Sequence, residues 1–226
     1  MKCTAAAGAA LPPRPPPFWG SPVYSIAMND PYPILDGATR VEIKVKGSRF
    51  IGEALPVDSV AAAEEALQAI RKREYDATHH CSAWRIDPEG REFRWSDDGE
   101  PSGSAGAPIF RQIEGRGLSG ALVVVTRYYG GTKLGTGGLI RAYGEAASLA
   151  LDEAPVREII PRERRTIRFA YEDTSPAMHT IGLFDAVMAG TRYSDVTEID
   201  LDIRSTEVDA FEATFVEALS GRGSVG

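Results

Sequence analysis

Apolar and polar residues alternate along the chain from about Arg40, which is where we expect folded structure to begin. Val41, Ile43 and Val45 alternate with charged residues, the pattern of a strand with one buried face. A turn at Gly47-Ser48 leads into a second strand from Arg49 to Val57, so a hairpin is predicted. Further strands are expected at His79 to Ile86, Glu92 to Ser96 and Val123 to Thr126.

Helical spacing separates these strands. A helix capped by Asp58 or Ser59 is predicted to run to Arg73, because its apolar residues recur on one face, at Val60, Ala63, Leu67 and Ile70. A second helix is expected from about Gly103 to Gln112, with Ser102 as a candidate cap. A third begins near Leu139. Strands and helices thus follow one another through this part of the chain.

A different pattern follows Ala154-Pro155. We expect a strand from Thr166 to Tyr171 and then a helix, ended by Gly190, whose face carries Met178, Ile181, Phe184 and Met188. A strand at 199–204 and a helix at 208–219 come next, with room for one more strand near Tyr193 to Thr197. This β-α-β-α order predicts a ferredoxin-like arrangement that is short of its closing strand.

The glycine-rich stretch from Val123 to Tyr143 holds the first candidate site. Five glycines follow the predicted strand, and Tyr128 and three cations surround them: Gly130, Gly131, Gly135, Gly137 and Gly138, with Arg127, Lys133 and Arg141. A strand, a glycine loop and a helix start with cations favour anion binding. The spacing matches neither a Walker A loop nor a dinucleotide fingerprint, so a tight packing turn is the alternative.

An acidic loop upstream has two interpretations. Asp97, Asp98 and Glu100 could serve acid–base chemistry or bind a hard cation. Alternatively, these carboxylates accept hydrogen bonds from the free N–H groups at the start of the following helix. The structural interpretation is favoured.

His79, His80 and Cys81 resemble a metal site only at first sight. Adjacent strand residues point to opposite faces, so at most His79 and Cys81 share one. Two ligands without a second pair make a poor zinc site, and we expect no metal and no cofactor. Lys44, Lys46 and Arg49 lie close together across the first hairpin, where solvated strand charges are the simpler interpretation.

Composition limits the class of protein. The chain has 226 residues, 43% of them hydrophobic and 25% charged, which fits one large domain or two small ones. Two cysteines provide no disulfide framework, and no apolar run approaches the length of a membrane span, so a cytoplasmic protein is expected. The net charge of −7 disfavours indiscriminate nucleic-acid binding, and any such role requires a local patch.

The first 27 residues are proline-rich and are predicted to be polyproline II or disordered. A signal peptide or a PxxP ligand at Pro12 to Pro17 are alternatives to this prediction. We favour a third interpretation, in which Met28 is the true start of the protein.

Three segments together resemble a known family. They are Tyr75 to Trp84, the loop SDDGEPSGSAG from Ser96, and the stretch VVVTRYYGGTKLGTGGLIRAYGEA from Val123. The chain is similar in these motifs to the Impact family, in its simple bacterial YigZ-type form without the RWD-type domain of eukaryotic members. The resemblance spans about Val41 to Leu151.

The resemblance implies a two-domain α+β architecture. Residues 1–39 would be a disordered or extended segment, and 40–154 an Impact-type N-terminal domain. That domain would resemble a ribosomal-protein domain and domain IV of elongation factor G, with a left-handed βαβ connection. Residues 155–226 would be the ferredoxin-like domain.

The resemblance also implies a role in regulating translation, by binding RNA, the ribosome or a translation-associated protein through the glycine loops. An enzyme acting on a phosphorylated small molecule or nucleotide is the alternative. The candidate binding residues for an anion or RNA are Arg49, His79, Asp97, Asp98, Glu100, Ser102, Arg127, Tyr128, Gly130, Gly131, Lys133, Gly135, Gly137, Gly138 and Arg141. No catalytic residue is assigned.

Overall fold

The computed structural model describes residues 30–226, in which a five-stranded sheet forms the larger part. Its strands stand in the order β2-β3-β6-β4-β5 and all adjacent pairs are antiparallel. The predicted hairpin is confirmed as β2 and β3. The strand bounds are Thr39–Val45 for β2, Ser48–Pro56 for β3, His79–Arg85 for β4, Phe93–Ser96 for β5 and Ala121–Tyr128 for β6.

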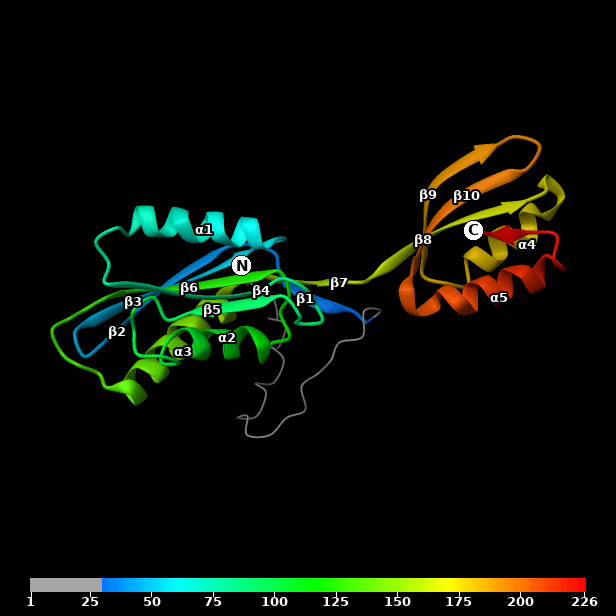
Figure 1. The fold of residues 1–226 in the computed structure, drawn as a ribbon. Helices are drawn as coiled ribbons and strands as arrows, with labels where there is room; N and C mark the ends of the chain where they lie inside the picture. Colours follow the sequence, from blue (N-terminus) through cyan, green and yellow to red (C-terminus); the bar gives the residue numbers. More distant parts are fainter. Residues whose placement is uncertain (1–29) are drawn as a thin grey trace, which may run out of the picture.

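Helices cover both faces of this sheet (Figure 1). Helix α1 (Val60–Arg73) lies on one face, where Ala63 and Ile70 pack with apolar residues of β4 and β6. Helices α2 (Gly106–Glu114) and α3 (Thr136–Glu153) cover the other face and enclose the largest apolar core. Because α1 is flanked by β3 and β4, and both strands run antiparallel to β6 between them, it forms a crossover between parallel strands.

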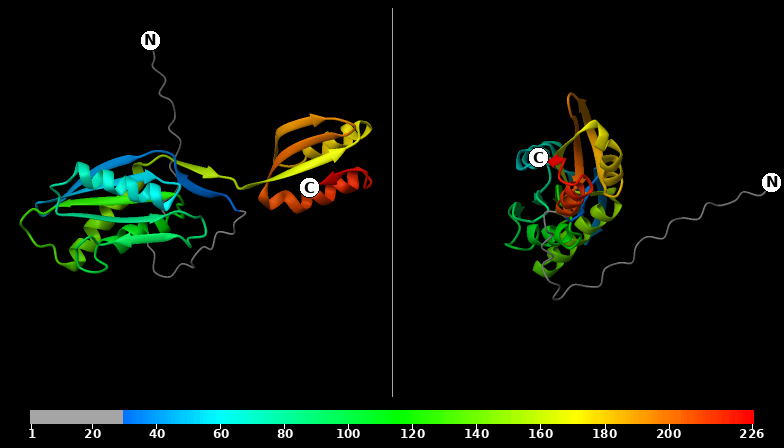
Figure 2. Two further views of the ribbon diagram at one scale, coloured as in Figure 1. Left: turned by 45° about the horizontal axis from the view of Figure 1, so that its top comes forward. Right: turned by 90° about the vertical axis from the view of Figure 1, so that its right-hand side faces the viewer.

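A second sheet of four strands follows, in the order β11-β8-β10-β9. Its strands are β8 (Arg162–Phe169), β9 (Ala186–Tyr193), β10 (Thr197–Arg204) and β11 (Ser224–Val225). Helices α4 (Thr174–Ile181) and α5 (Val208–Ala218) follow short 3-10 turns and enclose a separate apolar core against one face of the sheet. Figures 1 and 2 show this unit beside the larger one.

Two expectations for this second unit are corrected. The helix predicted to run to Gly190 ends at Ile181, and Ala186–Tyr193 form strand β9. The apolar spacing that included Phe184 and Met188 therefore crosses a helix, a turn and a strand. The closing strand, expected to be missing, is present as the short β11, which pairs with β8.

A two-stranded ribbon precedes and follows the larger sheet in sequence. Strand β1 (Tyr32–Leu35) pairs antiparallel with β7 (Val156–Ile159), so regular structure begins before Arg40. The expectations for residues 1–27, including the proline-rich segment and the start at Met28, lie outside the described residues. Within residues 30–226, no helix combines the length and the apolar character needed to cross a membrane.

Candidate functional site

Asp97 is the cap of helix α2, which confirms the structural interpretation for this carboxylate. Its side-chain oxygens accept hydrogen bonds from the backbone N–H groups of Gly103, Ala105 and Gly106, at 2.8 to 2.9 Å. Burial alone would raise the pKa of Asp97, but the three donors outweigh it and the pKa is lowered. Ser102, the cap expected from the sequence, is exposed and lies before the helix.

Asp98 forms a tight turn and holds two neighbouring elements. Its φ of 43° and that of Gly99, 88°, are both left-handed, as in the turn that favours an Asp-Gly pair. The Asp98 carboxylate accepts hydrogen bonds from Arg71 and from the backbone N–H of His80. Asp98 is therefore bound within the fold and is not a free base.

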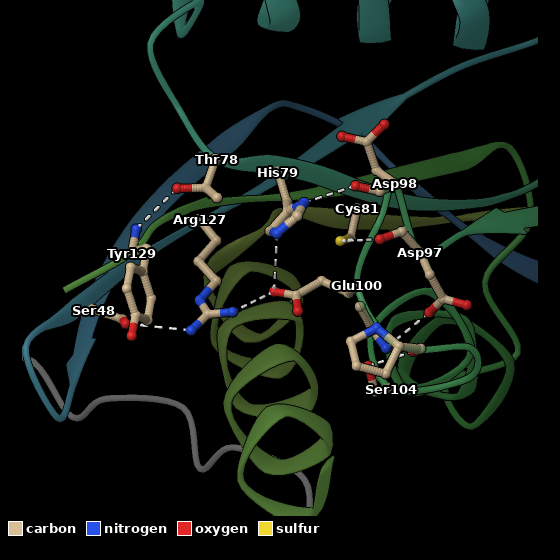
Figure 3. A network of polar contacts seen from close by, with 12 residues as sticks. Ser48, Thr78, His79, Cys81, Asp97, Asp98, Glu100, Ser104, Arg127 and Tyr129 are labelled. Carbon is tan, nitrogen blue, oxygen red and sulfur yellow. Dashed lines mark hydrogen bonds and ion pairs between the residues drawn. The ribbon is translucent and has the colours of Figure 1, made fainter. Parts of the chain in front are cut away.

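His79 is oriented by the same turn. Its Nδ1 lies 2.7 Å from the carbonyl oxygen of Asp98, which only accepts, so this nitrogen carries the proton. Its Nε2 then faces Glu100 Oε1 at 3.9 Å. Figure 3 shows His79 among the side chains of the acidic loop.

Arg127 and Glu100 form a buried ion pair (Figure 3). The Arg127 Nη1 to Glu100 Oε1 distance is 2.5 Å, and the Tyr143 hydroxyl donates to the same oxygen at 2.8 Å. Burial, the nearby Cys81 and this hydrogen bond raise the pKa of Tyr143. The expectation that Arg127 is a free phosphate-binding cation is wrong, because its charge is neutralised inside the fold.

Cys81 lies beneath this cluster and is fully buried. Its thiol donates to the carbonyl oxygen of Asp97 at 3.0 Å. Burial is the main cause that raises its pKa to about 12, and nearby carboxylates act in the same direction. A protonated thiol at neutral pH is neither a nucleophile nor a good metal ligand.

Tyr128 and Arg49 belong to the opposite face of the sheet, on the side of α1. The Tyr128 hydroxyl contacts the carboxylates of Glu74 and Asp76, at 2.8 and 3.0 Å. Burial and these hydrogen bonds raise the pKa of Tyr128 to about 12. The guanidinium of Arg49 stacks on the Tyr128 ring, 4.3 Å from its centroid.

The glycines divide into two kinds. A Cβ at Gly130 would lie 1.9 Å from the carbonyl carbon of Gly47, so Gly130 is required where the loop packs against the β2–β3 turn. Gly131 and Gly135 have φ values of 83° and 72° with nothing within 4 Å of a Cβ, so they serve the backbone conformation. Gly137 and Gly138 lie in the first turn of α3, where Gly138 approaches Leu134.

The remaining cations stand apart from the acidic loop. Lys133 and Arg141 are exposed, and neither forms an ion pair within residues 30–226. Arg141 reaches back along α3, so that its Nη1 lies 3.9 Å from the position of a Cβ on Gly137. The N-terminus of α3 carries no side-chain cap and no acidic residue in its first turn.

The acidic loop contacts the strand and the helix on either side of the second glycine-rich segment, but not all of the candidate residues converge. Glu100 binds Arg127 of β6 and Tyr143 of α3, and the Arg127 guanidinium lies 5.5 Å from the ring centroid of Tyr129. Asp98 and His79 share the buried cluster, whereas Lys133 and Arg141 belong to the exposed glycine loop. We call residues Tyr129 to Gly138, together with Arg141 in the second turn of α3, the glycine loop from here on.

Sequence reasoning missed two residues of this region. The Ser48 hydroxyl accepts from the backbone N–H of Gly130 at 3.1 Å and lies 3.5 Å from Arg127. Tyr143 ends the glycine-rich stretch and is not among the predicted site residues, yet its hydroxyl donates to Glu100. A tyrosine among alanines on a buried face is the signal that could have found it, because its hydroxyl needs a partner.

Comparison with known proteins places the chain in a family. A family model described as the Impact N-terminal domain matches residues 46–151. The IMPACT family member YvyE of Bacillus subtilis (strain 168) is 35% identical over 191 residues, which cover 81% of this chain and 85% of that protein. The IMPACT family member YigZ of Escherichia coli (strain K12) is 32% identical over 180 residues, covering 79% and 88%.

A crystal structure described as that of a hypothetical protein is also similar. It aligns with a TM-score of 0.60 at 30% sequence identity and covers 86% of this chain and 96% of its own. The structural similarity thus extends beyond residues 46–151, which the family model matches, and includes the second sheet. The chain belongs to the IMPACT family.

Proposed function

We propose that this protein binds RNA and acts in the regulation of translation, with the glycine loop as its phosphate-contacting surface. The observation that carries the proposal is the exposed loop itself. It leads into the uncapped N-terminus of the 18-residue helix α3 and carries two cations that the described residues leave unpaired, Lys133 and Arg141. Backbone N–H groups and cations are the donors that phosphate accepts in protein–RNA contacts.

A small hollow beside the loop supports this proposal. It has a volume of about 170 Å³ and lies between the β2–β3 turn and the start of α3. Lys46 and Arg141 both line it, with Gly138 between loop and helix and a single carboxylate, Glu145. Lys46 therefore joins Lys133 and Arg141 as a third cation of this surface.

An exposed aromatic ring adds to the surface. Tyr129 begins the glycine loop with 47% of its surface exposed, and its backbone N–H is held by Thr78. Unpaired bases stack on such rings, and stacking tolerates any base. An exposed tyrosine beside cations therefore favours single-stranded RNA over a duplex.

Other arginines are poor candidates for phosphate contacts. On the four-stranded sheet, Arg164 pairs with Asp202, and Arg192 pairs with Asp200 at 2.5 Å and with Glu198 at 3.1 Å. Arg168 likewise pairs with Glu198. These pairings neutralise the exposed arginines of the four-stranded sheet, which is consistent with the net charge of −7 and with a phosphate-binding surface on the other part of the chain.

Family membership is the reason to connect this surface with translation. We propose the division that the sequence predicts: an Impact-type domain at 40–154, with a fold like domain IV of elongation factor G and a left-handed βαβ connection, and a ferredoxin-like domain at 155–226. Separate apolar cores on the two sides of this boundary support the division. The RNA would be contacted free or within a ribosomal particle.

Fluorescence anisotropy with a labelled single-stranded RNA tests the proposal at low salt. We expect the double variant Lys133→Ala/Arg141→Ala to bind roughly tenfold or more weakly than the wild type, because two phosphate contacts are lost. The double variant Arg164→Ala/Arg168→Ala removes the same charge from the other sheet and should bind as the wild type does. A wild-type protein that does not bind RNA, or equal losses in both variants, would show the proposal to be wrong.

A further inference from the structure

A polar groove lies on the opposite face of the five-stranded sheet from α2 and α3. Helix α1 packs on β4 and β6 but leaves the edge strand β5 uncovered on this face. The space between helix and strand has a volume of about 430 Å³, within the range of small-molecule sites. Its lining comes from helix α1, from Ser82 and Trp84 of β4, and from Arg94 to Ser96 of β5.

The floor of the groove holds a hydroxyl group without a partner. Ser82 is 4% exposed and lines the groove, yet its hydroxyl forms no hydrogen bond with any of residues 30–226. The hydroxyl is open to the groove and is not sealed in the interior, so a ligand or a water molecule can supply its partner. Ser96 lies directly opposite across the β4–β5 pair, and its hydroxyl accepts from the Asp98 N–H at 3.3 Å.

The rim carries charges of both signs in equal number. Glu64 and Glu65 come from α1, and Arg71 and Arg94 come from α1 and β5. Arg71 donates to Asp98, while the only ion pair of Arg94 in the described chain is with Glu64 at 3.6 Å. Because the charges balance, the groove has no net attraction for a strongly charged ligand such as a phosphate ester.

The apolar wall is formed by Ala63, Leu67 and Trp84. A wall of carbon surface, two carboxylates, two guanidinium groups and two hydroxyls can satisfy a ring that carries several hydroxyl groups. Vicinal hydroxyls donate to carboxylates, as the ribose of a bound dinucleotide does to an acidic residue. Their oxygens accept in turn from arginine and serine.

We propose that this groove binds a neutral small molecule with a vicinal diol, the chemistry shared by ribonucleosides and monosaccharides. The diol contacts Glu64 or Glu65, another hydroxyl reaches Ser82, and the ring lies along Leu67 and Trp84. This site is separate from the glycine loop and does not depend on RNA binding.

Nuclear magnetic resonance of the ¹⁵N-labelled full chain tests this proposal with three probes: adenosine, 2′-deoxyadenosine and glucose. We expect adenosine, glucose or both to shift the indole N–H signal of Trp84 in a saturable way. Loss of the diol in 2′-deoxyadenosine should weaken binding at least about tenfold relative to adenosine, because the carboxylate is left without its donor. Binding of adenosine or of glucose shows whether the ligand is of the ribonucleoside or the monosaccharide class.

The variant Ser82→Ala separates a ligand contact from a structural role. It should fold and melt at or above the wild-type temperature, since no protein hydrogen bond is lost, and its probe affinity should fall several-fold. Arg168→Ala, on the other sheet, is the control and should leave both quantities unchanged. The proposal is overturned if no probe gives a saturable shift, if the deoxynucleoside binds as well as adenosine, or if Ser82→Ala lowers stability without changing affinity.

Discussion

At the scale of single residues, Asp97 shows how a carboxylate in a loop acts on a helix. Its three backbone hydrogen bonds hold the chain from Gly103 to Gly106 in place, and its own carbonyl oxygen accepts from Cys81. Asp97 thus joins the start of α2 through its side chain and strand β4 through its backbone carbonyl. Such a charged cap stabilises more than a neutral one, because charge-assisted hydrogen bonds are the stronger kind.

Replacing Asp97 by Asn should lower the free energy of unfolding by about 2 kcal/mol near neutral pH. The pKa of Asp97 in the folded protein is lowered from its ordinary value of 3.8. Its stabilisation is therefore present in full above that value and is lost as the pH falls through the folded pKa. Urea denaturation across the acid range should show the wild type and Asp97→Asn becoming more alike, and a constant difference would contradict this.

The sequence alone could indicate this role only in part. The alternative that the acidic residues satisfy a helix end is correct for Asp97, but the pattern offered Ser102 as the cap. Local spacing favours the nearest hydroxyl, whereas Asp97 reaches Gly106 from nine residues away. Local spacing also could not show that Arg127 is neutralised, because its partner Glu100 lies 27 residues away in sequence.

At the scale of elements, the glycine loop depends on one contact between two turns. Gly130 packs directly on Gly47 of the β2–β3 turn, and the Ser48 hydroxyl accepts a hydrogen bond from the backbone N–H of Gly130. A Cβ at Gly130 would collide with the backbone of Gly47. That backbone leads directly into β3, so it cannot shift without disturbing the pairing of β3 with β6. Gly131 next to it faces open space.

The variants Gly130→Ala and Gly131→Ala should therefore differ clearly. Gly131→Ala should lower the free energy of unfolding by about 1–2 kcal/mol, the cost of a left-handed conformation with a Cβ. Gly130→Ala should be more destabilising, because a Cβ there overlaps the Gly47 backbone. Urea midpoints of both variants check the order, and equal values would refute the packing role of Gly130.

Elements were predicted well where their apolar face is buried. Strand β10 alternates buried residues with partly exposed ones, and helix α1 ends at Arg73, as its helical spacing of apolar residues predicts. Both elements could therefore be predicted from the apolar pattern. Strand β9 did not, because it is an edge strand whose Val187 and Met188 are exposed. Its apolar residues fit a continued helix as well as a strand, and only pairing with β10 decides between them.

At the scale of the whole molecule, the two sheets have separate apolar cores. The larger part has two apolar clusters, whose residues lie between Leu35 and Ala154. The smaller part has one, whose residues lie between Ile167 and Val225. Strand β7 lies between these parts in sequence and pairs with β1, which precedes the larger sheet. Each part therefore holds its own source of hydrophobic stabilisation.

We expect the two parts to unfold at different denaturant concentrations. Of the three tryptophans, Trp84 and Trp95 lie in the larger part, Trp19 lies outside the described residues, and residues 155–226 contain none. Tryptophan fluorescence thus follows the larger part, whereas far-ultraviolet circular dichroism follows both. Transitions that do not coincide are the expected result. Coincident transitions would instead show that the two parts unfold as one cooperative unit.

The central claim is that the glycine loop contacts RNA phosphate with Lys133 and Arg141. The salt dependence of RNA binding tests it most directly, because each phosphate contact to a single strand contributes about −0.7 to the slope of log affinity against log salt concentration. The double variant Lys133→Ala/Arg141→Ala should reduce that slope by about 1.4, twice the single contribution. A slope that the double variant leaves unchanged would contradict the claim.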